Sequence, residues 1–293
     1  MRSKNHFSPL SSKERFPKRA TETHFTHKFK LLIEYEGTRF SGWQVQPHAP
    51  TVQGEVMNAI SECLETERFE FIGAGRTDAG VHALGQVAHL AISSEIIQRL
   101  PKELLQFRYA LNDRLPPDIN ILNLSTCPIT FHARHSAVAR SYLFQISRRR
   151  TAFGKKLVWW IKDELDLDRM IDASSHFIGR VDFRHFTDRD PEDGSTLVEM
   201  QPIQFAEFGE MIVMRFTASH FLWKQIRRMM GVLAEVGRGK LESSHVADLL
   251  FQPNPLVAKL TSPPSGLFFE TAYYDGDELP SEIHAPYELM MQG

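Results

Sequence analysis

The segment Gly73–Ala83, which reads Gly-Ala-Gly-Arg-Thr-Asp-Ala-Gly-Val-His-Ala, combines a flexible backbone with side chains that can do chemistry. Three glycines within eight residues indicate a backbone that needs a positive φ or a close approach to a neighbour. Between them lies Arg76-Thr77-Asp78, a carboxylate with a cation two residues before it. An ionised carboxylate can act as a nucleophile or a general base. On spacing alone, a tight turn whose Asp caps local amides fits equally well.

Other nucleotide and metal chemistries fit this segment poorly. A dinucleotide fingerprint needs a third glycine where Asp78 stands, and residues 81–87 do not have a helical pattern. A phosphate-binding loop needs Gly-Lys-Ser or Gly-Lys-Thr, which is absent. Asp78, His82 and His89 lack an accompanying His-Glu-x-x-His or Cys-x-x-Cys pattern, so we expect no metal site and exclude a zinc base deaminase. A glycosidase needs two carboxylates, and the segment offers one.

This segment, with Gly85-Gln86-Val87 after it, resembles the signature of the tRNA pseudouridine synthase A family. Four further segments resemble the family's motifs in the same order along the chain. They are Tyr35–Gln46 with Thr51–Gln53, Phe131–Arg134 with Ala137 and Arg140–Tyr142, Phe221–Gly239, and Pro263–Leu267. Five motifs in order are highly specific, and together they cover about residues 28–275.

The resemblance implies an isomerase that converts uridine to pseudouridine in the anticodon arm of tRNA, at positions 38 to 40, by base flipping and without a cofactor. It implies that Asp78 is the catalytic nucleophile, that Tyr142 stacks on the flipped uracil, and that Leu267 lines the pocket opposite. Arg227 resembles the cation that partners the carboxylate. Arg76 resembles the residue that enters the RNA stack or contacts nearby phosphates. Attack of Asp78 at C1′, addition to C6 and abstraction of a ribose proton stay open as chemical routes.

Elementary energetics agree with these roles. Removing a base from its stack costs a few kcal/mol of free energy, and stacking it on an aromatic ring offsets about 1–3 kcal/mol of this cost. A nearby cation keeps a partly buried carboxylate ionised. Arg228 is the rival of Arg227 for that position, but successive helical residues point about 100° apart, so we expect only one of them to face the site.

The chain departs from the family pattern at three places. Glu36 stands where the family usually has Asp, Ser219-His220 replaces a common pair before Phe221, and Trp223-Lys224 is bulkier and more basic than expected. Two alternatives are a catalytically silent tRNA-binding or folding protein and a paralogue that modifies another RNA. The complete Arg76-Thr77-Asp78 core argues against the silent protein, whereas Trp223-Lys224 is where a different substrate choice would show.

Charge is segregated along the 293 residues although the formal net charge is only −2. Residues 1–30 hold eight Lys or Arg against two Glu, residues 134–156 hold seven Lys or Arg and no acid, and residues 163–193 hold ten acids against four Arg. The central basic block predicts phosphate contacts beside the Tyr142 strand. Two cysteines exclude a disulfide framework, and no apolar stretch approaches the ~20 residues of a membrane span. We therefore expect a cytoplasmic protein with no membrane partner.

Hydrophobic periodicity predicts an interleaved set of strands and helices. Strands are expected over residues 29–35, 69–72, 86–92 and 138–147 and near 198–208 and 211–218. Helices are expected after Thr51, after Pro101, over about 166–178, over 220–236 with a terminal Gly237, and near 243–251. The lack of strict βαβ regularity favours an α+β fold.

We expect two lobes of mixed or antiparallel sheet with flanking helices and a central basic cleft, the pseudouridine synthase fold that the resemblance implies. The expected divisions are a basic, disordered arm over 1–27, an N-terminal lobe with the catalytic Asp over 28–130, a C-terminal lobe over 131–275, and an acidic tail over 276–293. The resemblance also implies a homodimer whose tRNA spans both subunits.

Overall fold

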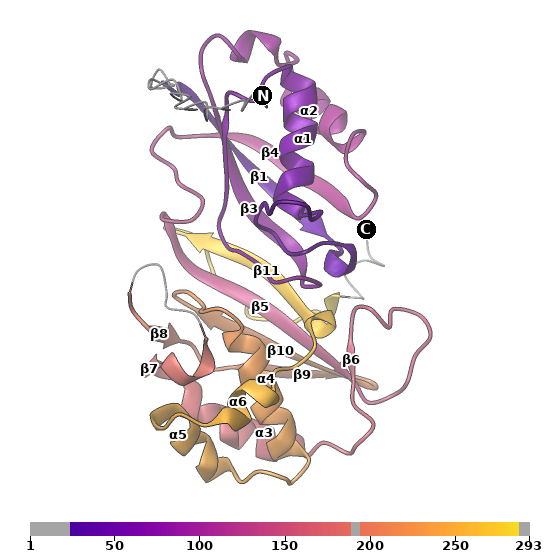
Figure 1. Ribbon diagram of the computed structural model, residues 1–293, viewed down its shortest axis with the longest axis vertical. Coiled ribbons are helices and arrows are strands. Elements are labelled where there is room, and N and C mark those ends of the chain that lie inside the picture. The colour runs from indigo at the N-terminus through magenta and orange to yellow at the C-terminus, as the bar shows by residue number, and fades with distance from the viewer. Residues whose placement is uncertain (1–23, 189–193, 287–293) are drawn as a thin grey trace, which may run out of the picture.

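The fold is built on one mixed sheet that runs through the whole molecule (Figure 1). The computed structural model describes residues 24–188 and 194–286. Within these ranges eleven strands form the sheet, with the central order β4-β1-β3-β11-β5-β10-β8-β7. Strand β2 pairs with β3, β6 with β5, and β9 with β10. The α+β class expected from the sequence is confirmed.

The N-terminal half contributes four strands and the helices α1 and α2, which lie at the upper end of Figure 1. Their bounds are β1 His27–Tyr35, α1 Val52–Leu64, β2 Glu70–Gly73, β3 His82–Ile92, α2 Leu104–Asn112 and β4 Ile119–Cys127. Helix α1 begins where predicted, because the Thr51 side chain accepts a hydrogen bond from the Gly54 amide. Its apolar stripe, with Val56 and Ile60 fully buried, packs into the core.

The C-terminal half contributes the remaining strands, and its helices gather at the lower end of Figure 1. The bounds are β5 Ala137–Ser147, β6 Trp159–Trp160, α3 Leu167–Ser174, β7 Gly179–Asp182, β8 Leu197–Met200, β9 Gln204–Phe208, β10 Met211–Ala218, α4 Gln225–Gly237, α5 Ser243–Phe251, α6 Pro255–Lys259 and β11 Leu267–Tyr274. One hydrophobic cluster extends from β1 in the N-terminal half to α4 and α5 in the C-terminal half.

The last strand of the chain, β11, joins the two halves at the centre of the sheet. It runs parallel to β3, with Phe268 opposite His82, and antiparallel to β5, with Phe269 opposite Tyr142. Residues near 270 therefore lie between segments near 82 and 142, which brings distant parts of the sequence together at the middle of the molecule.

Several sequence-based boundaries were wrong. Helix α4 begins at Gln225 rather than at residue 220, because the Gln225 side chain accepts a hydrogen bond from the Leu222 amide and closes a turn before the helix. The strand expected over 198–208 is two strands, β8 and β9, and β4 and β11 were not predicted. The left-handed glycine after α4 is Gly239, with φ of +68°, whereas Gly237 is the last helical residue.

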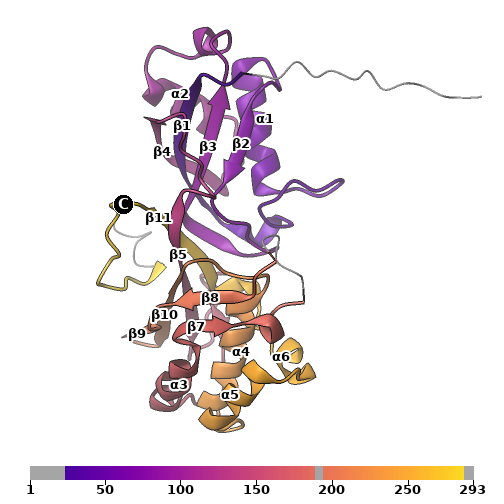
Figure 2. The ribbon, with the colours of Figure 1, turned by 90° about the vertical axis from the view of Figure 1, so that its left-hand side faces the viewer.

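Residues 275–286, the described segment after β11, cross one face of the sheet, and α1 and α4 lie on the other face (Figure 2). Buried Arg215 on β10 holds this segment by donating to the carbonyls of Pro280 and Glu282, and it pairs with Glu270 on β11 at 2.7 Å.

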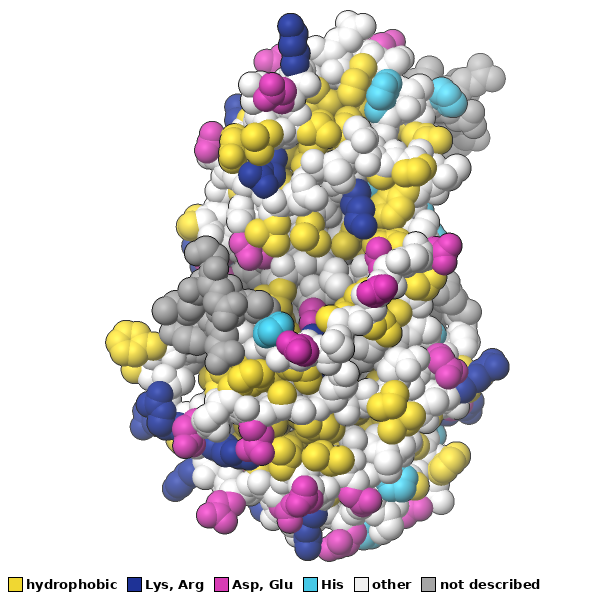
Figure 3. Space-filling model, turned by 180° about the vertical axis from the view of Figure 1, so that it is seen from behind, with side chains coloured by type: hydrophobic (Ala, Val, Ile, Leu, Met, Phe, Trp, Pro, Cys, Tyr) yellow, Lys and Arg dark blue, Asp and Glu magenta, His cyan; other side chains and the backbone are white. Residues whose placement is uncertain are grey.

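On the rear face of the molecule (Figure 3), Lys and Arg side chains are scattered among acidic and apolar ones.

Most of the predicted arm, residues 1–23, and the end of the predicted tail, residues 287–293, lie outside the described residues. The division into arm, two lobes and tail stays a prediction. Across the ranges that the structure describes, no helix combines the length and the apolar character that a membrane crossing requires.

Helix α4 packs so closely on the residues after α6 that Gly231 admits no side chain. A Cβ atom built there would lie 1.4 Å from the carbonyl oxygen of Leu260. We predict that Gly231→Ala destabilises the fold by about 3 kcal/mol or more, because backbone rather than a flexible side chain must move. Chemical denaturation measures this, with exposed Ser244→Ala on α5 as the control. A loss below about 1 kcal/mol would contradict the close approach.

Candidate active site

A cleft of about 780 Å³ opens at the junction of the two halves. Its walls come from the loops around residues 41–46 and 74–81 and from segments 134–142, 219–227 and Leu267. All five residues singled out in the sequence line it, namely Arg76, Asp78, Tyr142, Arg227 and Leu267. Among the described residues, the lining includes Arg76, Arg134, Arg140, Lys224 and Arg227 and a single carboxylate, Asp78. The cleft is therefore basic, as expected, although the chain as a whole is slightly acidic.

The loop that carries Asp78 connects the antiparallel strands β2 and β3. Strand β2 ends at Gly73, opposite Ala88, so the first residues of β3 extend beyond it and pair with β11 instead. The glycines serve as predicted: Gly80 adopts a φ of +76°, and a Cβ atom at Gly75 would lie 2.9 Å from the Phe269 ring. The loop thus lies across the junction where β2 gives way to β11.

Two buried side chains hold the loop in place. The Gln86 amide group accepts from the Gly75 N–H at 3.3 Å and donates to the Gly75 carbonyl at 3.0 Å. The Tyr35 hydroxyl lies 2.8 Å from Thr77 Oγ1, and the backbone N–H of Trp43 donates to the Thr77 carbonyl at 3.0 Å. Contacts from β1, from β3 and from the loop over residues 41–46 therefore fix the residues on both sides of Arg76. This leaves Asp78 little conformational freedom.

Arg227 on α4 pairs with Asp78, with Nη1 3.3 Å from Oδ2. The guanidinium is oriented by a second contact, because Nε donates to the Ser262 carbonyl at 2.8 Å. Ser262 also donates its N–H to the Arg227 carbonyl at 2.9 Å. The neighbouring Arg228 is buried and pairs with Asp188. Helical geometry therefore separates the two arginines as predicted, and Arg227 faces the cleft.

Tyr142 and Leu267 form an apolar wall beside this ion pair. The Tyr142 ring is wedged edge-on between Phe221 and Phe269, at centroid distances of 5.1 and 5.0 Å. Burial, together with nearby Tyr35 and the Asp78 carboxylate, raises the pKa of Tyr142 far above its usual value. The phenol is therefore neutral at physiological pH and can stack on or donate to a neutral base.

Trp223 and Lys224 line the cleft at the N-terminus of α4. Lys224 caps the helix with a φ of +60°, a left-handed backbone conformation that residues other than Gly rarely adopt. Its ammonium group lies 4.0 Å from the centre of the Trp223 ring. Such strain gathers at functional sites. The sequence pointed to this pair only as a departure from the family pattern.

The basic block over 134–156 does not present one uniform face. Arg140 turns inward and donates to the carbonyls of Ala137 and Ser219. Arg148 pairs with Glu207 at 2.6 Å, and Arg150 lies over the Trp160 ring. Arg134 and Arg140 line the cleft. Phosphate contacts by this block, Arg134 and Arg140 included, stay a prediction.

Sequence reasoning missed the residues that position the site rather than act in it. Gln86, Tyr35 and Thr77 lie inside motifs quoted for the resemblance, but their partners are far away in sequence. Ser262 directly precedes the last motif. Within the described residues no three or more His, Cys, Asp or Glu gather in a metal-binding arrangement. The expectation that the site needs no metal stays a prediction.

Comparisons with known proteins agree on one family. Residues 31–136 and 173–275 match the family described as tRNA pseudouridine synthase. The chain is 34% identical to a tRNA pseudouridine synthase A of an Exiguobacterium strain over 248 residues, which cover 85% of this chain and 98% of the relative. It is 35% identical to the protein of that name from Sinorhizobium fredii and 36% identical to that from Afipia carboxidovorans, each over 84% of this chain and 99% of the relative.

The buried contact between Tyr35 and Thr77 makes a stability prediction. Tyr35→Phe leaves the Thr77 hydroxyl without this partner, and we expect a loss of about 1–2 kcal/mol in the free energy of unfolding. Thr77→Val should cost a similar amount. Because the double variant leaves neither group unsatisfied, its cost should be smaller than the sum of the two single costs. Additive costs in urea denaturation would show that the contact contributes nothing.

Proposed function

The chain belongs to the tRNA pseudouridine synthase family, and we propose on this basis that it isomerises uridine to pseudouridine in the anticodon arm of tRNA, at positions 38 to 40. The observation that carries the proposal is the ion pair of Asp78 and Arg227 inside a basic cleft. Asp78, Arg76, Arg227 and Leu267 lie in the segments that match the family, and Tyr142 lies between them.

The reaction breaks the N1–C1′ bond of uridine and joins C1′ to C5. The proton at C5 is lost and N1 gains one, so the product is an isomer of the substrate. Because no electrons are exchanged with another molecule, the reaction requires no redox cofactor. The protein has to extract the base from its stack, hold it while it turns, and provide a group that acts on the sugar or the ring.

Asp78 is the group we assign to that step. Attack at C1′, addition to C6 and abstraction of a ribose proton each require an ionised carboxylate. Arg227 fixes one oxygen of Asp78, and the Ser262 carbonyl in turn fixes Arg227. A carboxylate held in this way is oriented before the substrate arrives, which reduces the reorganisation needed in the transition state.

The wall formed by Tyr142 and Leu267 is the proposed binding surface for the flipped uracil. Both side chains are almost fully buried by their neighbours, so little further ordering is needed when the base packs against them. Arg76 is exposed at the cleft and is assigned to the RNA stack or the adjacent phosphates. The cluster of cations supports an RNA backbone as the partner in this cleft.

The intact Arg76-Thr77-Asp78 core and the ion pair favour an enzyme over a silent tRNA-binding protein. The homodimer belongs to this proposal as a property that the resemblance implies, and the cytoplasmic location belongs to it as the expectation from the sequence composition.

We predict that Asp78→Asn abolishes pseudouridine formation, because an amide can neither attack nor accept the proton. The purified protein and the variant are incubated with unmodified tRNA transcripts, and carbodiimide adducts are located as reverse-transcription stops. Stops in the anticodon arm with the parent protein alone are expected, while exposed Asp168→Asn on α3 should behave like the parent. Stops elsewhere would reject the anticodon arm as the substrate, and none despite tight binding would favour the silent protein.

A second prediction concerns the strained cap. Lys224→Gly relieves the left-handed backbone, so the Tm should stay equal or rise by up to about 3 °C. If the Lys224 ammonium contacts tRNA phosphate, the Kd should rise about 3- to 10-fold and the salt dependence of binding should weaken by about one charge. Lys224→Arg, which keeps both charge and strain, is the matched control. An unchanged Kd in Lys224→Gly would remove this residue from the tRNA interface.

A further inference from the structure

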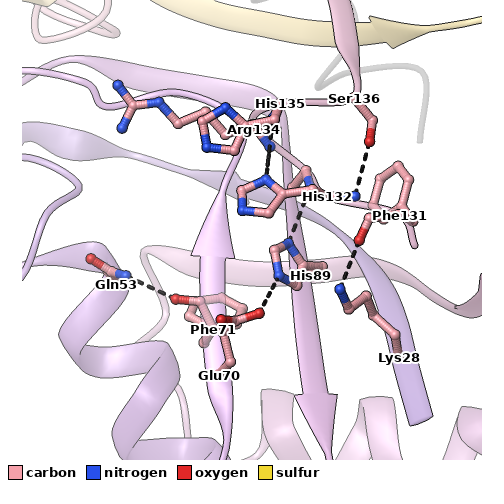
Figure 4. Close-up of polar contacts among 11 residues, drawn as sticks. Lys28, Gln53, Glu70, Phe71, His89, Phe131, His132, Arg134, His135 and Ser136 are labelled. Atoms are coloured by element: carbon pink, nitrogen blue, oxygen red, sulfur yellow. Dashed lines mark hydrogen bonds and ion pairs between the residues drawn. The ribbon is translucent and has the colours of Figure 1, made fainter. Parts of the chain in front are cut away.

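The turn between β4 and β5 borders the cleft. Its residues 131–136, which we call the histidine turn, include Arg134 and His135, and both line the cleft wall. Figure 4 shows the Arg134 and His135 side chains on one side of this turn, with the imidazoles of His132 and His89 one below the other beneath it. The His89 and His132 ring centroids lie 4.8 Å apart, and those of His132 and His135 lie 4.3 Å apart.

Two imidazoles accept the hydrogen bonds of three consecutive backbone amides in this turn. The Ala133 N–H donates to Nδ1 of His89 at 3.1 Å. The N–H groups of Arg134 and His135 both donate to Nδ1 of His132 at 3.2 Å. An imidazole nitrogen that accepts a hydrogen bond carries no proton. The turn therefore requires Nδ1 of both rings to be unprotonated.

The tautomer of His89 follows from its second contact. His89 is fully buried on β3, and its Nε2 lies 2.9 Å from Oε1 of Glu70 on β2. Since Nδ1 accepts from Ala133, the single ring proton lies on Nε2 and is donated to Glu70. Glu70 thus holds the ring of His89 in the orientation that serves the turn.

Further contacts anchor the two ends of the turn. The His132 N–H donates to Ser136 Oγ at 3.0 Å, and the Ser136 N–H donates to the His132 carbonyl at 2.9 Å. Lys28 on β1 donates to the Phe131 carbonyl at 2.9 Å. Arg140, which itself lines the cleft, donates to the Arg134 carbonyl. The backbone that carries Arg134 is therefore tied to β1, β3 and β5.

We propose that His89 and His132 are positioning residues for tRNA, which act by holding Arg134 and His135 at the cleft wall and do so only while Nδ1 of each ring is unprotonated. This inference rests on the proposed function, because it assumes that the cleft binds tRNA. Among the described residues, no hydrogen bond or ion pair joins His89 or His132 to Asp78 or Arg227. The proposal therefore concerns substrate affinity and leaves the chemical step to that pair.

The surroundings favour the neutral rings. Burial lowers the pKa of His89 and of His132 below their ordinary value, and Lys28 acts in the same direction on both, while Glu70 opposes it. His135 also lowers the pKa of His132. Because the pKa of each ring is lower in the folded protein than in the unfolded chain, the turn contributes its full stabilisation above the ordinary histidine pKa. This stabilisation is lost as the pH falls through the lower pKa of the folded state. Acid should therefore weaken tRNA binding through this turn, whereas protonation of exposed histidines would strengthen it.

The test compares His132→Ala with His132→Asn in the full-length protein. Asn can place its side-chain oxygen near the position of Nδ1, accepts the same amides and cannot be protonated there. We expect His132→Ala to raise the KM for tRNA about tenfold with kcat within about threefold of the parent, and His132→Asn to restore the KM to within about threefold. Exposed His245→Ala on α5 controls for loss of a histidine.

The pH dependence supplies a second readout. Between pH 7.5 and 5.5 the KM of the parent should rise, and that of His132→Asn should rise less or fall. Amide hydrogen exchange of residues 131–136 without RNA should accelerate in His132→Ala alone. If the parent forms no pseudouridine in tRNA, the proposed function fails. If it does, a parent-like KM in His132→Ala, or an Asn variant as impaired as the Ala variant, overturns the positioning role.

Discussion

The contact between Asp78 and Arg227 constrains the whole architecture, because its two members are 149 residues apart and come from different halves of the molecule. Asp78 can reach Arg227 only if the loop after β2 and the start of α4 meet at the same place. Strand β11 makes this possible by pairing with β3 on one side and β5 on the other. The last strand in sequence is thus the structural link that closes the site. A hydrophobic cluster that both halves share packs around that link.

The ion pair is not a large source of stability in itself. Its side chains are 24% and 14% exposed, between the fully solvated pairs that contribute little and the buried pairs whose desolvation offsets their attraction. Its orientation comes from neutral groups, namely the Ser262 carbonyl for Arg227, and Tyr35 and Gln86 for the loop around Asp78. Because those contacts are formed within the protein alone, the geometry is set before any substrate binds.

The sequence could predict what depends on local periodicity and on short motifs. The cap at Thr51, the strand over 29–35 and the outward direction of Arg227 relative to Arg228 all follow from neighbours within a few residues. The central place of β11 does not, because strand pairing depends on tertiary contacts that no local pattern records. The start of α4 was wrong for a local reason that hydrophobic periodicity does not record, since the Gln225 side chain accepts from the Leu222 amide and closes the turn before the helix. Gln86 and Ser262 had no local signal for their partners.

The basic character of the cleft in a slightly acidic chain follows from how its cations are held. Outside the cleft, Arg148, Arg184, Arg215 and Arg238 pair with carboxylates, so their fields are largely cancelled. Within it, Arg140 is held by backbone carbonyls, Lys224 lies over an indole ring, and Arg227 shares its guanidinium between a carbonyl and Asp78. Neutral acceptors fix a cation in place without removing its charge.

The neutral histidines extend the same principle to the turn that carries Arg134. They accept the hydrogen bonds of its backbone amides without adding a carboxylate to the cleft wall. A polyanion that enters the cleft therefore meets ordered positive charge, and Asp78 is the one carboxylate among the described residues that line it.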